Sequence, residues 1–144
     1  MDRTVWAYFA GLVDGEGCFM LTKHKNRNVK TGFGWNPSLR IANSDIRPLE
    51  LFKKEVGGII TSVVRNGKPF YYYIAYSNIL RKILPNIIPY LIIKKEEAQV
   101  MHKALLLLQH RQKQQRVTFV DIKLESYAKE LTKLKESRNH DWEG

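Results

Sequence analysis

Residues 9–17, FAGLVDGEG, are the most informative segment of this 144-residue chain. They close an apolar stretch, residues 3–14, whose small and aliphatic side chains predict a helix that stops at the glycines that follow. Gly11 and Gly15 lie four residues apart, and each weakens a helix by roughly 1 kcal/mol relative to alanine. On a helix they leave a strip of bare backbone that another helix, from the same chain or from a second copy, can approach closely.

Two acids, Asp14 and Glu16, lie where the predicted helix ends. A carboxylate at a helix C-terminus opposes the helix macrodipole, so its placement costs stability unless a cation lies nearby. A divalent metal ion is one such cation, because hard cations prefer carboxylate oxygens as ligands. The end of this helix is therefore a candidate metal site.

The charge of the chain indicates a polyanionic partner. Lys and Arg number 24 and Asp and Glu number 14, which leaves a net charge of +10. Such an excess favours nucleic acid first and an acidic membrane surface second, but no apolar run reaches the roughly 18 residues of a membrane span. The one cysteine, Cys18, excludes an intrachain disulfide and a zinc finger or ribbon. We expect a single basic domain over residues 1–144, in a reducing compartment with access to nucleic acid, such as an organelle, a bacterium or a phage.

Four segments have the composition and alternation of strands. They are residues 18–26, 33–42, 59–65 and 69–76. The alternation is cleanest over 33–42, where one face is apolar and the other polar. Pro37 inside this segment suggests an edge strand or a bulge. Asn66-Gly67, between the last two segments, predicts a tight hairpin turn.

The helical segments complete an α+β pattern. Helices are predicted over residues 3–14, from a cap at Ser44 or Asp45 to Val56, from Ser77 to a stop at Pro85, and over 94–111 and 119–136. This order predicts an αββαββα core with C-terminal helices added. One four-stranded antiparallel sheet would carry helices on one face, and its other face would be polar and basic.

FAGLVDGEG resembles the LAGLIDADG motif, which names a class of homing endonucleases. Two further segments are similar to parts of the same family: residues 41–58, IANSDIRPLELFKKEVGG, and residues 87–101, IIPYLIIKKEEAQVM. The three segments follow the order of the family and cover the chain to about residue 110. The chain has one motif and no internal repeat, so the resemblance implies the homodimeric, single-motif type.

The resemblance also implies a catalytic site at the end of the motif helix. Glu16 would be the metal-binding acid, and the backbone carbonyl of Gly15 would be a second ligand. The other catalytic residues implied are Asn43, Arg47 and Lys94, with Lys95 in place of Lys94 if the alignment shifts by one. The implied cofactor is Mg²⁺; Mn²⁺ would substitute for it, and Ca²⁺ would bind without supporting cleavage. The product would be a staggered double-strand break with 3′ overhangs.

The family's dimer would form through the motif helices. The resemblance implies that two such helices pack against each other through Ala7, Gly11 and neighbouring small residues. Asp14 would cap or hydrogen-bond at this interface. Each helix would then deliver its terminal acid to one strand of DNA.

The open face of the sheet is expected to lie in the major groove, which admits a β-ribbon. From the alternation, the outward residues of the first two strands are Met20, Thr22, His24, Asn26, Asn36, Ser38 and Arg40. The resemblance places Tyr71, Tyr73 and Ser62 outward on the second hairpin, and its turn pairs Arg65 with Lys68. Two half-sites of one helical turn each imply a pseudo-palindromic target of roughly 20 bp.

Three functions are compatible with this pattern. The first is a site-specific homing endonuclease. The second is a maturase, in which the same fold binds structured intron RNA. The third is a DNA-binding regulator that does not cleave, and the acid at position 16 argues against it, because a pure binder does not need that acid.

Overall fold

The computed structural model describes residues 2–25, 33–110 and 119–143. The elements are α1 (Arg3–Glu16), β1 (Gly17–Lys25), β2 (Phe33–Asn43), α2 (Arg47–Val56), β3 (Ile59–Arg65), β4 (Lys68–Tyr76), α3 (Ser77–Ile87), the short 3₁₀ helix η1 (Ile88–Tyr90), α4 (Lys95–His110) and α5 (Phe119–Glu143). Their order confirms the predicted α+β arrangement. Among these described helices, none is long and apolar enough to cross a bilayer.

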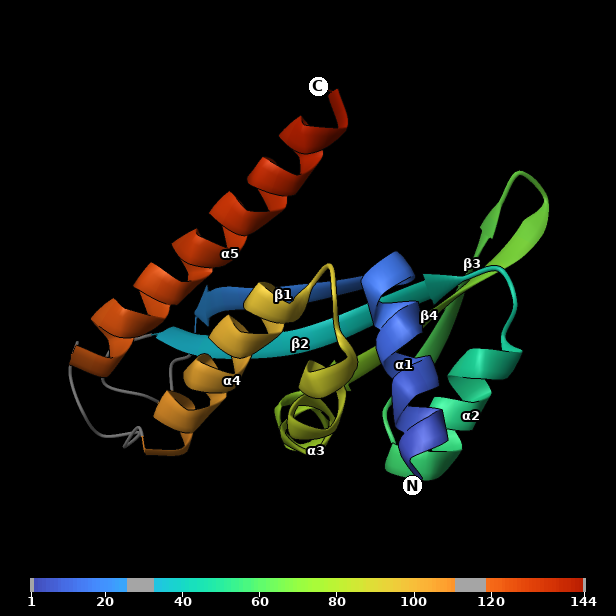
Figure 1. Cartoon of the computed structure of the whole chain (residues 1–144), viewed down its shortest axis with the longest axis horizontal. Helices are drawn as coiled ribbons and strands as arrows, with labels where there is room; N and C mark the ends of the chain where they lie inside the picture. The colour runs from blue at the N-terminus through green and yellow to red at the C-terminus, as the bar shows by residue number, and fades with distance from the viewer. Residues whose placement is uncertain (1, 26–32, 111–118, 144) are drawn as a thin grey trace.

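The four strands form one antiparallel sheet in the order β1-β2-β4-β3. Helices α4, α3, α1 and α2 follow one another along this sheet, and α5 extends beyond it at the β1 end (Figure 1). Alternate strand residues such as Phe19, Leu39 and Ile41 are fully buried, whereas Thr22 and Arg40 are exposed. The sheet therefore has one face covered by helices and one open face.

An aromatic cluster positions α1 over the sheet. The ring centroids of Phe9 and Phe52 are 4.0 Å apart, and those of Phe52 and Tyr73 are 6.2 Å apart. All three side chains are fully buried, so α1, α2 and β4 meet at one point. Burial of a phenylalanine side chain contributes about 1.5–3 kcal/mol. This cluster fixes α1 and α2 against β4.

Helix α1 is two residues longer than predicted, because Gly15 does not end it. The helix continues to Glu16, and the chain enters β1 at Gly17, whose N–H donates to the carbonyl of Val13. A Cβ at position 17 would lie 2.7 Å from that carbonyl oxygen, while a Cβ at position 15 would meet no atom within 4 Å. The close approach that requires glycine is at residue 17.

Two proline predictions need correction. Pro85 does not stop α3, which runs on to Ile87; Ile83, Leu84 and Ile87 are fully buried, and their packing offsets the hydrogen bond that proline removes. Pro37 lies in a central strand, and the β1–β2 register passes through it without a bulge. It is tolerated because β4 pairs with β2 only from Ser38 onward, which leaves Pro37 beyond the end of β4.

The residues of β4 lie on the opposite faces of the sheet from those expected. Tyr73 is fully buried, and its hydroxyl donates to the carbonyl of Gly57 at 2.6 Å, so burial raises the pKa of Tyr73. Tyr71 shares its face and pairs with Ser62, so all three residues lie on the helix side of the sheet. The cause is the register, which pairs Tyr73 with the core residue Ile41. Tyr71, Tyr73 and Ser62 are therefore wrong as outward residues.

The room for the Tyr73 ring comes from Gly58. Residue 58 has a φ of +114°, and a Cβ there would lie 2.5 Å from Cε2 of Tyr73. We expect Gly58→Ala to lower the free energy of unfolding by about 2–4 kcal/mol, because backbone strain and overpacking act together. Urea denaturation measures the change.

Gly67→Ala is the matched control for that substitution. Residue 67 also has a positive φ, +76°, but a Cβ there would meet no atom within 4 Å. Gly67→Ala should therefore lower the free energy of unfolding only by the cost of backbone strain, about 1 kcal/mol. Equal losses for the two variants would contradict the packing role of Gly58.

Candidate active site and nucleic-acid interface

Glu16 is the last residue of α1, and its side chain is exposed. Among the described residues it has no hydrogen-bond or ion-pair partner, so its oxygens face solvent. The partial negative charge of the helix C-terminus adds to that of the carboxylate. This end of α1 therefore attracts cations.

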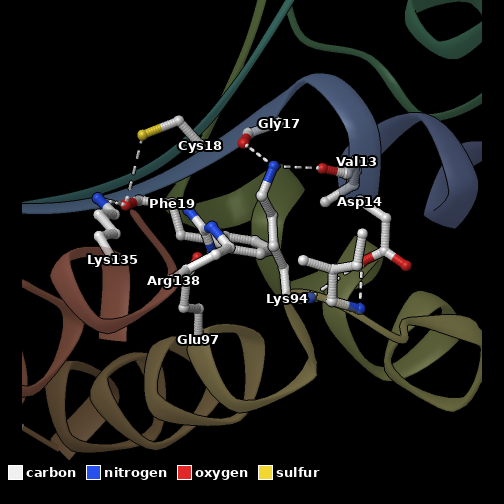
Figure 2. Close-up of polar contacts among 10 residues, drawn as sticks. Val13, Asp14, Gly17, Cys18, Phe19, Lys94, Glu97, Lys135 and Arg138 are labelled. Carbon is white, nitrogen blue, oxygen red and sulfur yellow. Dashed lines mark hydrogen bonds and ion pairs between the residues drawn. The ribbon is translucent and has the colours of Figure 1, made fainter. Parts of the chain in front are cut away.

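Asp14, two residues earlier, is fully engaged within the chain. Its carboxylate accepts hydrogen bonds from the backbone N–H groups of Ile92 (2.8 Å), Ile93 (3.2 Å) and Lys94 (3.0 Å), and Figure 2 shows the bond from Lys94. The expectation of a capping role is confirmed, but the groups capped belong to the segment before α4 in the same chain. Asp14 therefore fixes the position of Lys94 against α1.

Lys94 reaches the end of α1 directly. Its ammonium group donates to the carbonyls of Gly17 (2.5 Å) and Val13 (3.0 Å), and the residue is only 6% exposed (Figure 2). Burial is the main cause that lowers the pKa of Lys94, and the nearby Arg138 lowers it further. Lys95 is the first residue of α4, so the structure brings Lys94 and not Lys95 to the site.

A second layer of charged residues supports Lys94 from α4 and α5. Glu97 is 2% exposed and forms an ion pair with Arg138, and Lys135 donates to the carbonyl of Phe19 at 2.5 Å (Figure 2). Sequence reasoning missed these residues. No local spacing indicates them, because the Glu97–Arg138 pair joins positions 41 residues apart.

Asn43 and Arg47 lie in the turn between β2 and α2. The Asn43 side-chain oxygen accepts from the backbone N–H of Asp45, while the Arg47 guanidinium makes a two-pronged ion pair with the Asp45 carboxylate. This pair lowers the pKa of Asp45 to about 2. Asn43 is two residues beyond Ile41, the β2 partner of Gly17, so it lies near the end of α1.

Arg47 is placed differently from the expectation. It lines a shallow pocket with Tyr8, which precedes Glu16 by two turns of α1, or ~12 Å along the helix axis. The described contacts of its guanidinium are to Asp45 and not to Glu16. In this structure Arg47 therefore stands apart from the Glu16–Lys94 end of the site.

The β1–β2 half of the open face is polar, as predicted. Thr22, His24, Asn36 and Arg40 are exposed there, and the Thr22 hydroxyl donates to the carbonyl of Asn36 at 3.3 Å. Met20 is half-buried, and Ser38 is only 8% exposed between its strand partners, which limits its reach. Asn26 lies outside the described residues.

The β3–β4 half of the open face holds a chain of stacked side chains. The Arg40 guanidinium lies 5.2 Å from the Tyr72 ring centroid, and Arg65 lies 5.1 Å from the Phe70 ring centroid. Arg65 also donates to the Tyr72 hydroxyl at 2.5 Å. Arg65 and Lys68 pair across the turn as predicted and share the open face with Tyr72, an outward residue that sequence reasoning missed. This half is not uniformly polar, because Ile59 and Val63 are exposed beside the arginines.

Comparison with protein families identifies the chain. Residues 9–105 match the model of the LAGLIDADG endonucleases, and this range includes the end of α1, the sheet and the Lys94 segment. The chain belongs to the LAGLIDADG endonuclease family. A search of curated proteins found no match to it.

Solved structures share the fold of this LAGLIDADG chain. The archaeal intron-encoded homing endonuclease I-Vdi141I, in complex with DNA, is 22% identical with a TM-score of 0.77, over 93% of this chain and 86% of that one. I-CvuI, solved with its target in 2 mM Ca, is 18% identical with a TM-score of 0.65, over 90% and 96% of the two chains. The meganuclease I-SmaMI, bound to uncleaveable DNA, is 26% identical with a TM-score of 0.66, over 76% of this chain and 38% of that one.

The LAGLIDADG helix, α1, carries an open strip of glycines. Gly11 and Gly15 are exposed, and a Cβ at either position would meet no described atom within 4 Å. Ala7, one turn earlier, is partly exposed. Packing within the described part of the chain therefore does not explain the two glycines.

The three hydrogen bonds to Asp14 should make it a stability residue. We expect Asp14→Ala to lower the free energy of unfolding by about 2–3 kcal/mol, because three N–H groups lose a charged acceptor. Urea denaturation at one fixed protein concentration measures this loss. Glu16→Ala is the control, since removal of an acid without bonds should change stability by no more than about 0.5 kcal/mol. Equal losses would show that Asp14 is not the anchor.

Proposed function

We propose that this chain is a site-specific homing endonuclease that cuts both strands of duplex DNA with the help of a divalent metal ion. One observation carries the proposal: the solvent-facing carboxylate of Glu16 lies at the end of α1, where the anchored ammonium of Lys94 also lies. The protein has a net charge of +10, which favours binding of DNA near this end of the sheet. There, a carboxylate and a fixed cation are suited to phosphodiester hydrolysis.

The donor set fits Mg²⁺ when DNA completes it. Within the described residues there is no group of three His, Cys, Asp or Glu side chains that could close around an ion. Mg²⁺ does not need such a cage, because it keeps several waters and is commonly held by one or two carboxylates plus substrate phosphates. Glu16 and the Gly15 carbonyl would hold the ion; Mn²⁺ would replace it, and Ca²⁺ would bind without supporting cleavage. The ion would supply an activated water and charge stabilisation.

Lys94 is preorganised for its role. Two of its three ammonium protons are donated to the carbonyls of Val13 and Gly17, which leaves one for a water or a phosphate oxygen. Because the group is already fixed, no reorganisation is needed when negative charge develops on the phosphate. Asn43 keeps its amide N–H₂ as a donor, since its oxygen accepts from Asp45. Arg47 would contribute only after exchanging its contact with Asp45 for a phosphate.

A homodimer would supply two such sites. The open strip at Gly11 and Gly15 allows two α1 helices to approach closely about a two-fold axis. Each copy would then bring one Glu16 to one DNA strand. This arrangement fits a pseudo-palindromic target and a staggered cut with 3′ overhangs.

A cleavage screen tests the proposal. Purified protein is incubated with Mg²⁺ and a library of randomised and candidate intron-insertion duplexes, and the ends of the products are mapped. We expect discrete double-strand cuts with 3′ overhangs that disappear when the metal is chelated. Duplex binding without cutting in Mg²⁺ and Mn²⁺ would instead indicate a regulator. Selective binding of structured intron RNA, without duplex binding, would indicate a maturase.

A further inference from the structure

Three aliphatic side chains interrupt the polar character of the open face. Ile59 and Val63 on β3 are 49% and 41% exposed, and Ile74 on β4 is directly opposite Ile59. All three share the face of Tyr72, because residues of the same parity point to the same side of a strand. We call Ile59, Val63 and Ile74 the aliphatic patch.

Arginines flank the patch on both sides. Arg40 on β2 pairs across the sheet with Ile74, and Arg65 lies two residues beyond Val63 on β3. Stacking on Tyr72 and Phe70 holds both guanidinium groups close to the sheet surface. A DNA backbone drawn to these two charges would bring base edges over the aliphatic side chains between them.

The chemistry of the major groove then limits what the patch can recognise. Thymine alone among the four bases presents an apolar group there, its C5 methyl. The other bases present hydrogen-bonding groups, which lose water against an aliphatic side chain and gain no partner. An aliphatic side chain therefore favours thymine over the other bases.

We propose that the aliphatic patch makes the β3–β4 hairpin a thymine-selective reader, which recognises C5 methyl groups at the base pairs beneath it. The β1–β2 half would read its base pairs through polar side chains such as Asn36. The inference rests on the proposed DNA-binding function and assigns a base preference to one part of each half-site.

Uracil substitution tests the proposal, because uracil differs from thymine only by the methyl group. A bound duplex is first selected from a randomised library, and each thymine in it is then replaced singly by deoxyuridine. Each replacement that removes a methyl group contacted by the patch should weaken binding about fourfold. These sensitive positions should form a cluster of adjacent base pairs in each half-site. Replacement of thymines outside that cluster should leave the affinity unchanged.

Two neighbouring valines provide a matched pair of variants. Val63→Thr keeps the shape of the side chain and replaces one methyl with a hydroxyl, so it should reduce the thymine–uracil difference. Val64 is 75% exposed on the opposite face of β3, so Val64→Thr should leave the difference intact. An equal effect of the two variants would overturn the assignment to the patch.

The remaining outcomes separate this inference from the proposed function. Specific duplex binding with equal affinity for thymine and uracil throughout would overturn the inference and leave the proposed function standing. A selected site without thymine beneath the hairpin would do the same. A change in self-association on Val63→Thr, with the thymine preference intact, would show that the patch is a protein contact. Absence of any duplex binding would overturn both proposals.

Discussion

Replacement of Glu16 by glutamine is expected to reduce DNA cleavage by at least about a thousandfold, while duplex binding is unchanged or slightly tighter. The amide is a neutral and much weaker ligand for a divalent cation, yet it has nearly the same shape. Glu16 is the acid with solvent-facing oxygens at the end of α1, because those of Asp14 accept three backbone N–H groups. Single-turnover cleavage across a range of Mg²⁺ concentrations measures the expected loss of activity. Duplex binding, measured in parallel, checks that affinity is retained.

Glu55→Gln is the control for this substitution. Glu55 is an exposed acid on α2, so its replacement removes the same charge away from the end of α1. Its cleavage rate should match that of the original chain. Full cleavage by Glu16→Gln would refute the assignment of Glu16 as the metal ligand. Asp14 would then have to give up its bonds to the segment before α4 in order to bind metal.

Replacement of Gly11 by leucine is expected to yield a folded monomer that no longer makes double-strand breaks. A Cβ at residue 11 meets no described atom within 4 Å, so the larger side chain is compatible with the fold of one chain. Loss of a helical glycine should stabilise that chain by up to about 1 kcal/mol. The same side chain would hold two α1 helices apart, so folding and assembly should change in opposite directions.

Sedimentation velocity and thermal unfolding measure these two effects. Gln99→Leu is the control, because Gln99 is exposed on α4 and also becomes an added surface leucine. It should retain the dimer and the activity. A Gly11→Leu protein that remains dimeric would rule out the α1 strip as the interface, and one that fails to fold would contradict the open space around Gly11.

Local patterns predicted most of the secondary structure. The Asn66-Gly67 hairpin is present with positive φ values of 53° and 76°, and Ile59–Arg65 and Lys68–Tyr76 are the strands on either side. The strand over 33–42 also has the predicted alternation, because its apolar residues contrast with polar neighbours. These features depend on residues close together in the chain, where sequence patterns are strongest.

Local sequence patterns could not predict which face of the sheet each residue of β4 occupies. Residues 71–73 are three consecutive tyrosines, so they show no contrast between an apolar and a polar side. Contacts with distant residues determine the face on which Tyr73 lies. These are its pairing with Ile41 and the space above Gly58. A shift by one residue moves every side chain of a strand to the other face. For this reason the predicted outward pair, Tyr71 and Tyr73, was wrong.

The candidate site also combines features that the sequence predicts with features that only the tertiary structure decides. The sequence was enough to place two acids and two glycines on one helix or directly at its end, to identify the family segment containing Lys94, and to predict the sheet. The tertiary structure decided that Asp14 is an anchor while Glu16 stays open, and that Lys94 binds the end of α1 with Glu97 and Arg138 behind it. Lys94 donates to carbonyls 77 and 81 residues away in the chain. Such contacts form only when packing brings distant segments together, so no local pattern can encode them.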